Sequence, residues 1–486
     1  MNRLIAKIAK KVTADYCRLS IVENPDGFLT QSTVRHLLYQ EHGLEVITGS
    51  NLQLRIHFEL HYKEATGKHF IYVCQDKSSL LPDMMQGTVV CDFNVSDVFS
   101  LFADKSLVNR QSFDVLNRLD EKNIIKRVSM SECHILIDGI LREIEEEKRR
   151  SAEYFNQQLA QIPIDWSHPK ETMAEVATVT AQAIKAGAYD GIGEHIADIN
   201  NKFQDWVDDN YFATLHSNAL LQPKSVNAIL PHLEANYGID DKLALLVVDG
   251  FSYWQYTLLK DYLHSKGIQT HDNTTLAWLP SITMLSRQAI FRGGTPKQDY
   301  KQSPENERQL WTNYWHEHGF GNYEIQYLSD KDEFAVNEGI KRLAVVTTEM
   351  DEKMHSSTDY KDLYSLTENW CPRIMEQIEA ILSAGYTLYL TTDHGSAYSQ
   401  GWRSLTQTEK VFLYKDGSRG ARHLIYNNEE EQKRFIENNP DLRLLVHDNW
   451  MSIRGEQCFA RENTNMITHG GSHFMEVVIP WVKITR

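Results

Sequence analysis

The sequence predicts an α/β protein whose C-terminal half forms a doubly wound, mostly parallel sheet. Two observations support this prediction. Between residues 240 and 486, apolar runs of strand length alternate with helix-like segments, the pattern of a sheet with helices on both faces. Several of these runs are followed by carboxylates and histidines, which suits the carboxyl ends of parallel strands meeting at one edge. We therefore expect a ligand-binding α/β domain at 240–486.

Two further parts are expected before this domain. Residues 1–110 predict a small mixed α/β domain, in which Leu52–Leu60 alternates apolar and polar residues like a half-buried strand. His69–Cys74 and Thr88–Phe93 predict neighbouring strands. Across residues 111–239 the apolar positions recur with a helical period, so we expect a helical middle domain.

Composition narrows the class of protein. Of 486 residues, 42% are hydrophobic and 24% are charged, as in soluble globular proteins. The formal net charge of −16 argues against a protein that coats polyanions, although bound cations would allow a phosphate substrate. The six cysteines form no CxxC pair, which excludes a zinc ribbon. No secretory signal or membrane span is evident, so a cytoplasmic location is expected.

Two apolar runs are followed by acidic residues. Leu243–Val248 leads directly into Asp249, and Arg342–Val346 precedes Asp351 and His355 after a short polar stretch. On one helical turn, a carboxylate and an imidazole four residues apart share a face and can bind one ion. A surface pair would look the same, so the spacing alone is weak evidence.

A third run, Tyr386–Leu390, is followed by Asp393 and His394. Adjacent residues on a regular strand point to opposite faces, so these two side chains converge only if the chain turns. Gly395 allows such a turn because glycine adopts backbone conformations that other residues avoid. This pair is therefore a stronger indication of a metal site.

The segment Leu279–Arg287 begins in a loop and continues as a helix, which places Thr283 near a helix N-terminus. Backbone donors and the helix dipole favour an anion there, and a hydroxyl beside a cation can attack phosphorus. The alternative is that Ser281 or Thr283 only caps the helix. His469 lies in a glycine loop that leads to another strand candidate, Glu476–Pro480.

Taken together and in this order, the residues resemble the alkaline phosphatase superfamily. The closer resemblance is to the PglZ domain, which occurs in BREX phage-defence systems and in PorX-type response regulators. It covers about residues 240–486, and no receiver domain of the response-regulator kind is evident at the N-terminus. The motifs that carry it are Val248-Asp249-Gly250, Leu279-Pro-Ser-Ile-Thr283, Ser286-Arg-Gln-Ala-Ile-Phe291, Thr392-Asp-His-Gly395 and Thr468-His-Gly-Gly471.

The resemblance implies two divalent metal ions, with zinc expected and manganese or magnesium as alternatives. It also implies that Thr283 is the catalytic nucleophile. The ligands of one ion would be Asp351, His355 and His469. The ligands of the other would be Asp249, Thr283, Asp393 and His394. The candidates for binding phosphate or supporting the ligands are Arg287, Arg292, Arg422 and His473.

The implied function is a cytoplasmic metal-dependent phosphohydrolase, more specifically a phosphodiesterase acting on nucleotide or nucleic-acid phosphate esters. Its partners would be other phage-defence proteins. Two alternatives stay open: a metal-binding scaffold of the defence complex, and a phosphomonoesterase or phosphomutase-like enzyme. The aromatic-rich stretch 294–323 is expected to cover the site, although Trp311 and Trp315 would also suit a core. The sequence carries no signal for the oligomeric state.

Overall fold

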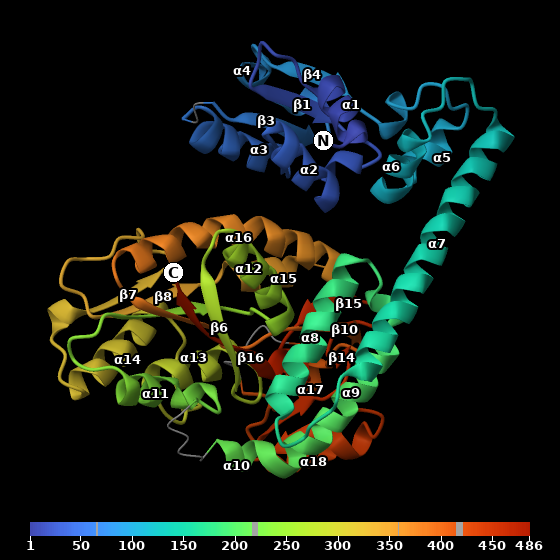
Figure 1. Cartoon of the computed structure of the whole chain (residues 1–486). Coiled ribbons are helices and arrows are strands. Elements are labelled where there is room, and N and C mark those ends of the chain that lie inside the picture. The colour runs from blue at the N-terminus through green and yellow to red at the C-terminus, as the bar shows by residue number, and fades with distance from the viewer. Residues whose placement is uncertain (65–66, 216–221, 358, 415–420) are drawn as a thin grey trace. The chain divides into compact units, whose positions relative to one another are not determined.

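The chain folds into two compact units, residues 1–148 and 149–486. The computed structural model shown in Figure 1 describes residues 1–64, 67–215, 222–357, 359–414 and 421–486. Helix α7 (Met130–Gln161) spans the division between the units. The sequence predicts domain boundaries after residues 110 and 239, whereas the two compact units divide after residue 148. The three predicted domains stay a prediction. None of the described helices is both long enough and apolar enough to cross a membrane.

The first unit contains a parallel sheet in the order β2-β3-β1-β4. Its strands are β1 (Leu19–Glu23), β2 (Leu44–Thr48), β3 (His69–Cys74) and β4 (Val89–Asp92). Apolar side chains of α1 (Arg3–Val12) and α2 (Ser32–His42) pack on one face, and those of α3 (Asn51–His57) and α4 (Pro82–Met85) on the other. Two short helices follow, α5 (Lys105–Asn109) and α6 (Phe113–Glu121). Strands β3 and β4 lie where the sequence predicts them.

The strand predicted at Leu52–Leu60 is wrong. This segment is helical, with α3 continuing into a π-helical turn at Phe58–Tyr62. The side chain of Ser50 accepts a hydrogen bond from the Gln53 amide at 3.3 Å, and the Gln53 side chain accepts one from the Ser50 amide at 2.8 Å. This reciprocal cap satisfies two backbone donors that a helix start would otherwise leave open, so it favours the helix.

The second unit is built on a six-stranded sheet in the order β6-β16-β9-β5-β8-β7. Only β16 runs antiparallel to its neighbours in this sheet. The strands are β5 (Leu243–Val248), β6 (Gln269–Leu276), β7 (Ile325–Ser329), β8 (Arg342–Thr347), β9 (Thr387–Thr391) and β16 (Val478–Thr485). The predicted mostly parallel sheet is therefore confirmed.

Helices cover both faces of this sheet, as Figure 1 shows. Alternate residues of β5 enter two different cores: Leu246 contributes to one and Leu245 to the other. The helices of the first core include α8 (Pro169–Lys185), α12 (Tyr253–Ser265) and α16 (Tyr360–Ser383). Those of the second include α11 (Ile229–Asn236), α13 (Thr283–Arg292) and α14 (Pro304–Glu317). The sheet is thus doubly wound.

Two small sheets lie in the chain between β9 and β16. One has β10 (Ala397–Gly401) between β14 (Gln457–Cys458) and β15 (Asn465–Thr468). The other has β13 (Trp450–Ile453) between β11 (His423–Ile425) and β12 (Leu444–His447). The helices of this region are α17 (Gln407–Val411), α18 (Glu429–Asn438) and α19 (Phe474–Val477). Because α19 is a helical turn, the strand expected at Glu476–Pro480 begins at Val478.

Helix α14 of the stretch 294–323 packs against the sheet, and the cap expected from this stretch stays a prediction. This helix contacts α13 and β7. The side chains of Trp311 and Trp315 are fully buried in the core on that face of the sheet. The packing interpretation of these tryptophans is therefore the one that the structure supports.

Candidate metal centre

The seven predicted ligands come from five segments that meet at the carboxyl edge of the central sheet. Asp249 follows β5 directly, and Thr283 is the first residue of α13. Helix α15 (Glu349–Ser356) follows β8 and carries two of the ligands. Two more follow β9, and the last lies just after β15. The remaining five predicted ligands are Asp351, His355, Asp393, His394 and His469.

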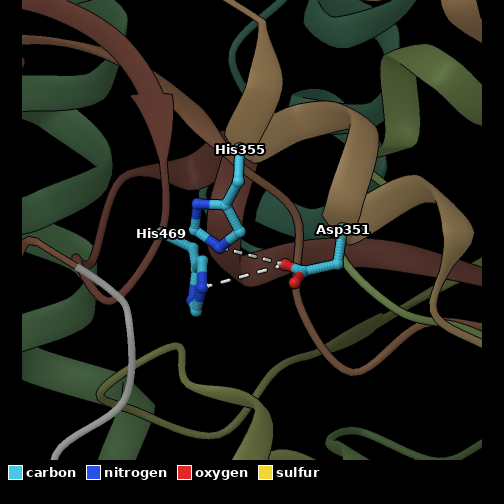
Figure 2. Close-up of side chains that lie close together, drawn as sticks. All are labelled: Asp351, His355 and His469. Carbon is cyan, nitrogen blue, oxygen red and sulfur yellow. Dashed lines mark ion pairs between the residues drawn. The ribbon is translucent and has the colours of Figure 1, made fainter. Parts of the chain in front are cut away.

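One group of ligand atoms belongs to Asp351, His355 and His469 (Figure 2), and these atoms all lie within 4.8 Å of one another. Asp351 Oδ1 is 3.4 Å from His355 Nε2 and 3.9 Å from His469 Nε2. The spacing of four residues places the carboxylate and the His355 imidazole on one side of α15, as the sequence predicts.

A second group lies beside the first. Ligand atoms of Asp249, Asp351 and His394 also lie within 4.8 Å of one another, so Asp351 stands between the two groups. The Thr283 hydroxyl oxygen is 3.0 Å from His394 Nε2 and 3.5 Å from Asp249 Oδ1. Asp393 Oδ2 lies 3.6 Å from His394 Nε2. The structure thus brings all seven predicted residues into one cluster.

Backbone carbonyls fix the orientation of two imidazoles. Nδ1 of His394 lies 2.9 Å from the Gly395 carbonyl oxygen, and Nδ1 of His469 lies 2.9 Å from the Ser281 carbonyl oxygen. A carbonyl oxygen only accepts, so each Nδ1 carries the proton and each Nε2 presents its lone pair to the cluster. Histidines that bind metal ions are commonly held in this way.

Burial disfavours the charged form of two carboxylates in the cluster, Asp249 and Asp393. Asp393 Oδ1 accepts hydrogen bonds from the Gly250 and His394 amides at 3.2 and 3.0 Å. Asp393 Oδ2 is buried and has no hydrogen-bond partner among the described residues. Burial raises the pKa of Asp393 to about 6, and burial together with the Asp393 charge raises the pKa of Asp249 to about 7. A divalent cation would stabilise both charges, so these donors fit a metal ion.

Arg287 holds Asp249 in place. The guanidinium donates to Asp249 Oδ2 at 2.8 Å and to Glu307 Oε2 at 2.6 Å, and all three side chains are buried. Tyr327 also donates to Glu307 Oε2. Of the two predicted roles for Arg287, these contacts favour support of a ligand over binding of phosphate. Sequence reasoning missed Glu307, because nothing local to α14 indicates a partner on α13.

The other three predicted phosphate candidates lie outside the cluster. Arg292 ends α13, about 13 Å along the helix from Thr283 at roughly 1.5 Å per residue. Arg422 is fully buried, and its guanidinium donates to groups of the neighbouring loops, among them Glu476. His473 is buried at the start of α19, and its Nδ1 accepts from the Met475 amide at 3.2 Å. Burial lowers the pKa of His473 to about 3.

Gly395 is required for a reason other than the expected one. Its φ is not positive, so the turn needs no left-handed backbone there. A Cβ at this position would instead lie 2.0 Å from the Met475 carbonyl oxygen and 2.8 Å from Ser252 Oγ. The glycine thus allows two backbone segments to approach closely beside Asp393 and His394.

A doubly wound α/β sheet with carboxylates, imidazoles and one helix-terminal hydroxyl at its carboxyl edge defines an alkaline-phosphatase-like domain. A family model described as the BREX system PglZ alkaline phosphatase-like domain matches residues 226–484, and the chain belongs to this family. The resemblance predicted from the motifs is therefore confirmed.

Solved structures also resemble the chain. Murine ectonucleotide pyrophosphatase/phosphodiesterase 5 is 11% identical, and the match covers 50% of this chain and 88% of that one with a TM-score of 0.35. Phosphonoacetate hydrolase from Sinorhizobium meliloti 1021 is 8% identical, with 50% and 89% covered and a TM-score of 0.34. A search of curated proteins finds no match.

Proposed function

We propose that the chain is a two-metal phosphodiesterase acting on nucleotide or nucleic-acid phosphate esters, with Thr283 as the nucleophile. The observation that carries the proposal is the position of the Thr283 hydroxyl. It lies at the first residue of α13, within 3.0 Å of His394 Nε2 and 3.5 Å of Asp249 Oδ1. A hydroxyl that only capped the helix would have no need of a buried carboxylate and an imidazole beside it.

Zinc is the expected ion, with manganese or magnesium as alternatives, and two such ions would stabilise charge on the attacking and leaving oxygens. The residues proposed to hold one ion are Asp351, His355 and His469. Those proposed to hold the other are Asp249, Thr283, Asp393 and His394.

Thr283 would act in two steps. In the first, its oxygen bonds to phosphorus, the bond from phosphorus to the leaving oxygen breaks, and the hydroxyl proton passes to water. Asp249 Oδ1 and His394 Nε2 lie beside the hydroxyl and would hold the ion that eases the loss of this proton. In the second, water attacks the phosphothreonine and restores the hydroxyl. The first amides of α13 lack acceptors within the helix, so they can donate to the anionic phosphoryl group.

The arginines favour a diester over a monoester. A monoester dianion carries more charge on its free oxygens, which makes a nearby arginine more valuable. Arg287 and Arg422 are both engaged with buried carboxylates, and Arg292 lies at the far end of α13. None of the three is placed to meet such a dianion at Thr283. Family membership supports a role within a BREX-type defence system, with other proteins of that system as partners.

The test combines metal content with hydrolysis of bis-p-nitrophenyl phosphate and p-nitrophenyl phosphate. We expect about two metal ions per chain, preference for the diester, and loss of activity on chelation with recovery on adding metal. Thr283→Ala should lower turnover at least about 1,000-fold, since the nucleophile is lost. The control is Thr257→Ala on α12, whose hydroxyl donates to the Trp254 carbonyl and lies outside the cluster.

Each other result has a definite meaning. Metal binding without turnover by the wild type, with defence surviving in Thr283→Ala, would favour the scaffold alternative. Preference for the monoester would favour the phosphomonoesterase alternative. A chain that binds no metal would refute the ligand set itself.

A further inference from the structure

We infer that Glu476 is a positioning residue that fixes His469 through Ser281, and that this contact sets the affinity of one of the two metal ions. The inference rests on the proposed function. It concerns residues that carry no catalytic atom themselves, since Glu476 and Ser281 lie behind the ligands. Both side chains are fully buried.

Ser281 joins two loops of the site. Its carbonyl oxygen accepts from Nδ1 of His469 at 2.9 Å, and its hydroxyl oxygen accepts from the Gly470 amide at 2.9 Å. Ser281 is also two residues before Thr283 on the same loop. One serine therefore holds the imidazole by its backbone and the neighbouring glycine by its side chain. Any movement of Ser281 moves the ring that presents Nε2 to the cluster.

Glu476 fixes the orientation of Ser281. The Ser281 hydroxyl has one proton and two acceptors within reach, Glu476 Oε2 at 2.8 Å and the Gly471 carbonyl at 2.9 Å. The carboxylate is the stronger acceptor because it is charged. The same Oε2 accepts from the Gly471 amide at 2.6 Å. One carboxylate oxygen thus ties the loop that leads to Thr283 to the loop that contains His469.

Arg422 balances the charge of Glu476 without entering the metal cluster. Its Nε donates to Glu476 Oε1 at 2.8 Å, and its other nitrogens donate to Ser399 Oγ and to the carbonyls of Gly455 and Gln457. Both oxygens of the carboxylate are therefore engaged: Oε1 accepts from the arginine, and Oε2 accepts from the two loops. A buried pair this complete holds its partners in a single geometry.

A glutamine cannot replace this carboxylate. Glu476→Gln keeps the shape, but one amide oxygen has to serve donors that now use two oxygens, and the new amide nitrogen faces other donors. Ser281→Ala is gentler, because it leaves the pair of Arg422 and Glu476 intact. Both changes weaken the link between the Ser281 loop and the His469 loop, although in Ser281→Ala the Gly471 amide still donates to Oε2. Loss of a group that orients a metal ligand commonly lowers metal affinity by about 10–100-fold.

The experiment measures metal binding by the full-length, metal-free protein, using zinc and a competing chromophoric chelator, and the unfolding of the same samples by urea. For Glu476→Gln and Ser281→Ala we expect the affinity for one ion to fall about 10–100-fold, with the other changed less than about threefold. We expect two control variants to bind both ions with wild-type affinity. Ser399→Ala removes another partner of Arg422. Glu409→Gln disrupts the pair of Arg403 and Glu409, which lies away from the cluster.

The outcomes separate this inference from the proposed function. Ser281→Ala is decisive if Glu476→Gln does not fold. The positioning role would be overturned if Ser281→Ala bound both ions with wild-type affinity, or if it lost affinity equally at both sites. The proposed function would still stand in that case, provided that the wild type binds two ions. A wild type that binds no zinc, manganese or magnesium would overturn both.

Discussion

Replacing Arg287 with methionine tests the buried charge network beside the candidate metal centre. The change keeps an unbranched side chain of similar width but removes the donors to Asp249 and Glu307. The exposed fractions of the three side chains are 4%, 5% and 0%, so water cannot replace the lost partner. Removing one member of a buried pair costs about 3–5 kcal/mol, because it leaves the other charge uncompensated.

The size of the thermal effect follows from the size of the unit. Residues 149–486 make up the second unit, and about 2.1 cal/mol/K per residue gives an unfolding entropy of roughly 0.7 kcal/mol/K for it. A loss of about 3–5 kcal/mol then lowers the melting midpoint by about 4–7 °C. Arg403→Met is the matched control, because Arg403 and Glu409 form a similar pair near the surface, worth about 1 kcal/mol or less.

The loss should also depend on pH. Burial raises the pKa of Asp249 to about 7 in the metal-free protein, and the Arg287 charge opposes this rise. Without the arginine, the folded-state pKa rises further above the unfolded value near 4, so folding takes up a proton. The destabilisation is then small at pH 4 and grows as pH rises through 7.

Urea unfolding in the presence of a chelator, at pH 5 and pH 8, measures this difference. A loss in Arg287→Met below about 1 kcal/mol at pH 8, or the same loss at both pH values, would refute the argument from a buried uncompensated charge.

Two further predictions concern packing and protonation. Gly395→Ala should destabilise the second unit by at least about 3 kcal/mol in urea unfolding, because its Cβ would meet a backbone oxygen at 2.0 Å. Gly139→Ala, in open space on α7, should instead be neutral or stabilise by up to about 1 kcal/mol, and similar losses in both would contradict the steric argument. Burial lowers the pKa of His423 to about 4, below the unfolded value near 6.5, so stability should fall by up to about 3 kcal/mol between pH 7 and pH 4. His423→Gln should flatten this dependence in urea titrations, and an unchanged slope would contradict it.

The central sheet could be predicted from the sequence because its signal is local. The predicted run Leu243–Val248 coincides with β5, in which every residue is buried. A strand covered by helices on both faces has no reason to alternate, so it stands out as a continuous apolar run between polar residues. Five of the seven predicted ligands follow such runs, so the same local signal indicates them: Asp249, Asp351, His355, Asp393 and His394.

Helix α3 shows where a periodic pattern misleads. Apolar residues at every second position also place positions four apart on one side of a helix. In the structure Leu54 and Phe58 are buried on that side, while Leu52 and Ile56 are 69% and 49% exposed. Two of the alternating residues, Leu54 and Phe58, therefore also fit one buried side of a helix. The capping pattern of Ser50 with Gln53 was the local signal that favoured the helix over the strand.

The contacts that support the site could not be predicted, because they join distant parts of the chain. Arg287 meets Glu307 across 20 positions, and Ser281 meets Glu476 across 195. In a family that resembles phosphatases, an arginine near the predicted site suggests a phosphate-binding role. Only the fold shows that Arg287 is paired with Asp249 and Glu307. Residue type, local spacing and the family resemblance predict the ligands, whereas the residues that contact those ligands depend on tertiary structure.

The place of β16 in the sheet has a consequence for how the protein is made. This strand lies between β6 and β9, and its residue Val478 pairs with Leu276. A ribosome adding about 5–20 residues per second needs roughly 10–40 s to travel from one to the other. Throughout that time β6 lacks the neighbour that joins it to the sheet, and an unpaired strand edge invites association with other chains. The edge of β6 that will pair with β16 therefore stays unpaired during much of the second half of synthesis.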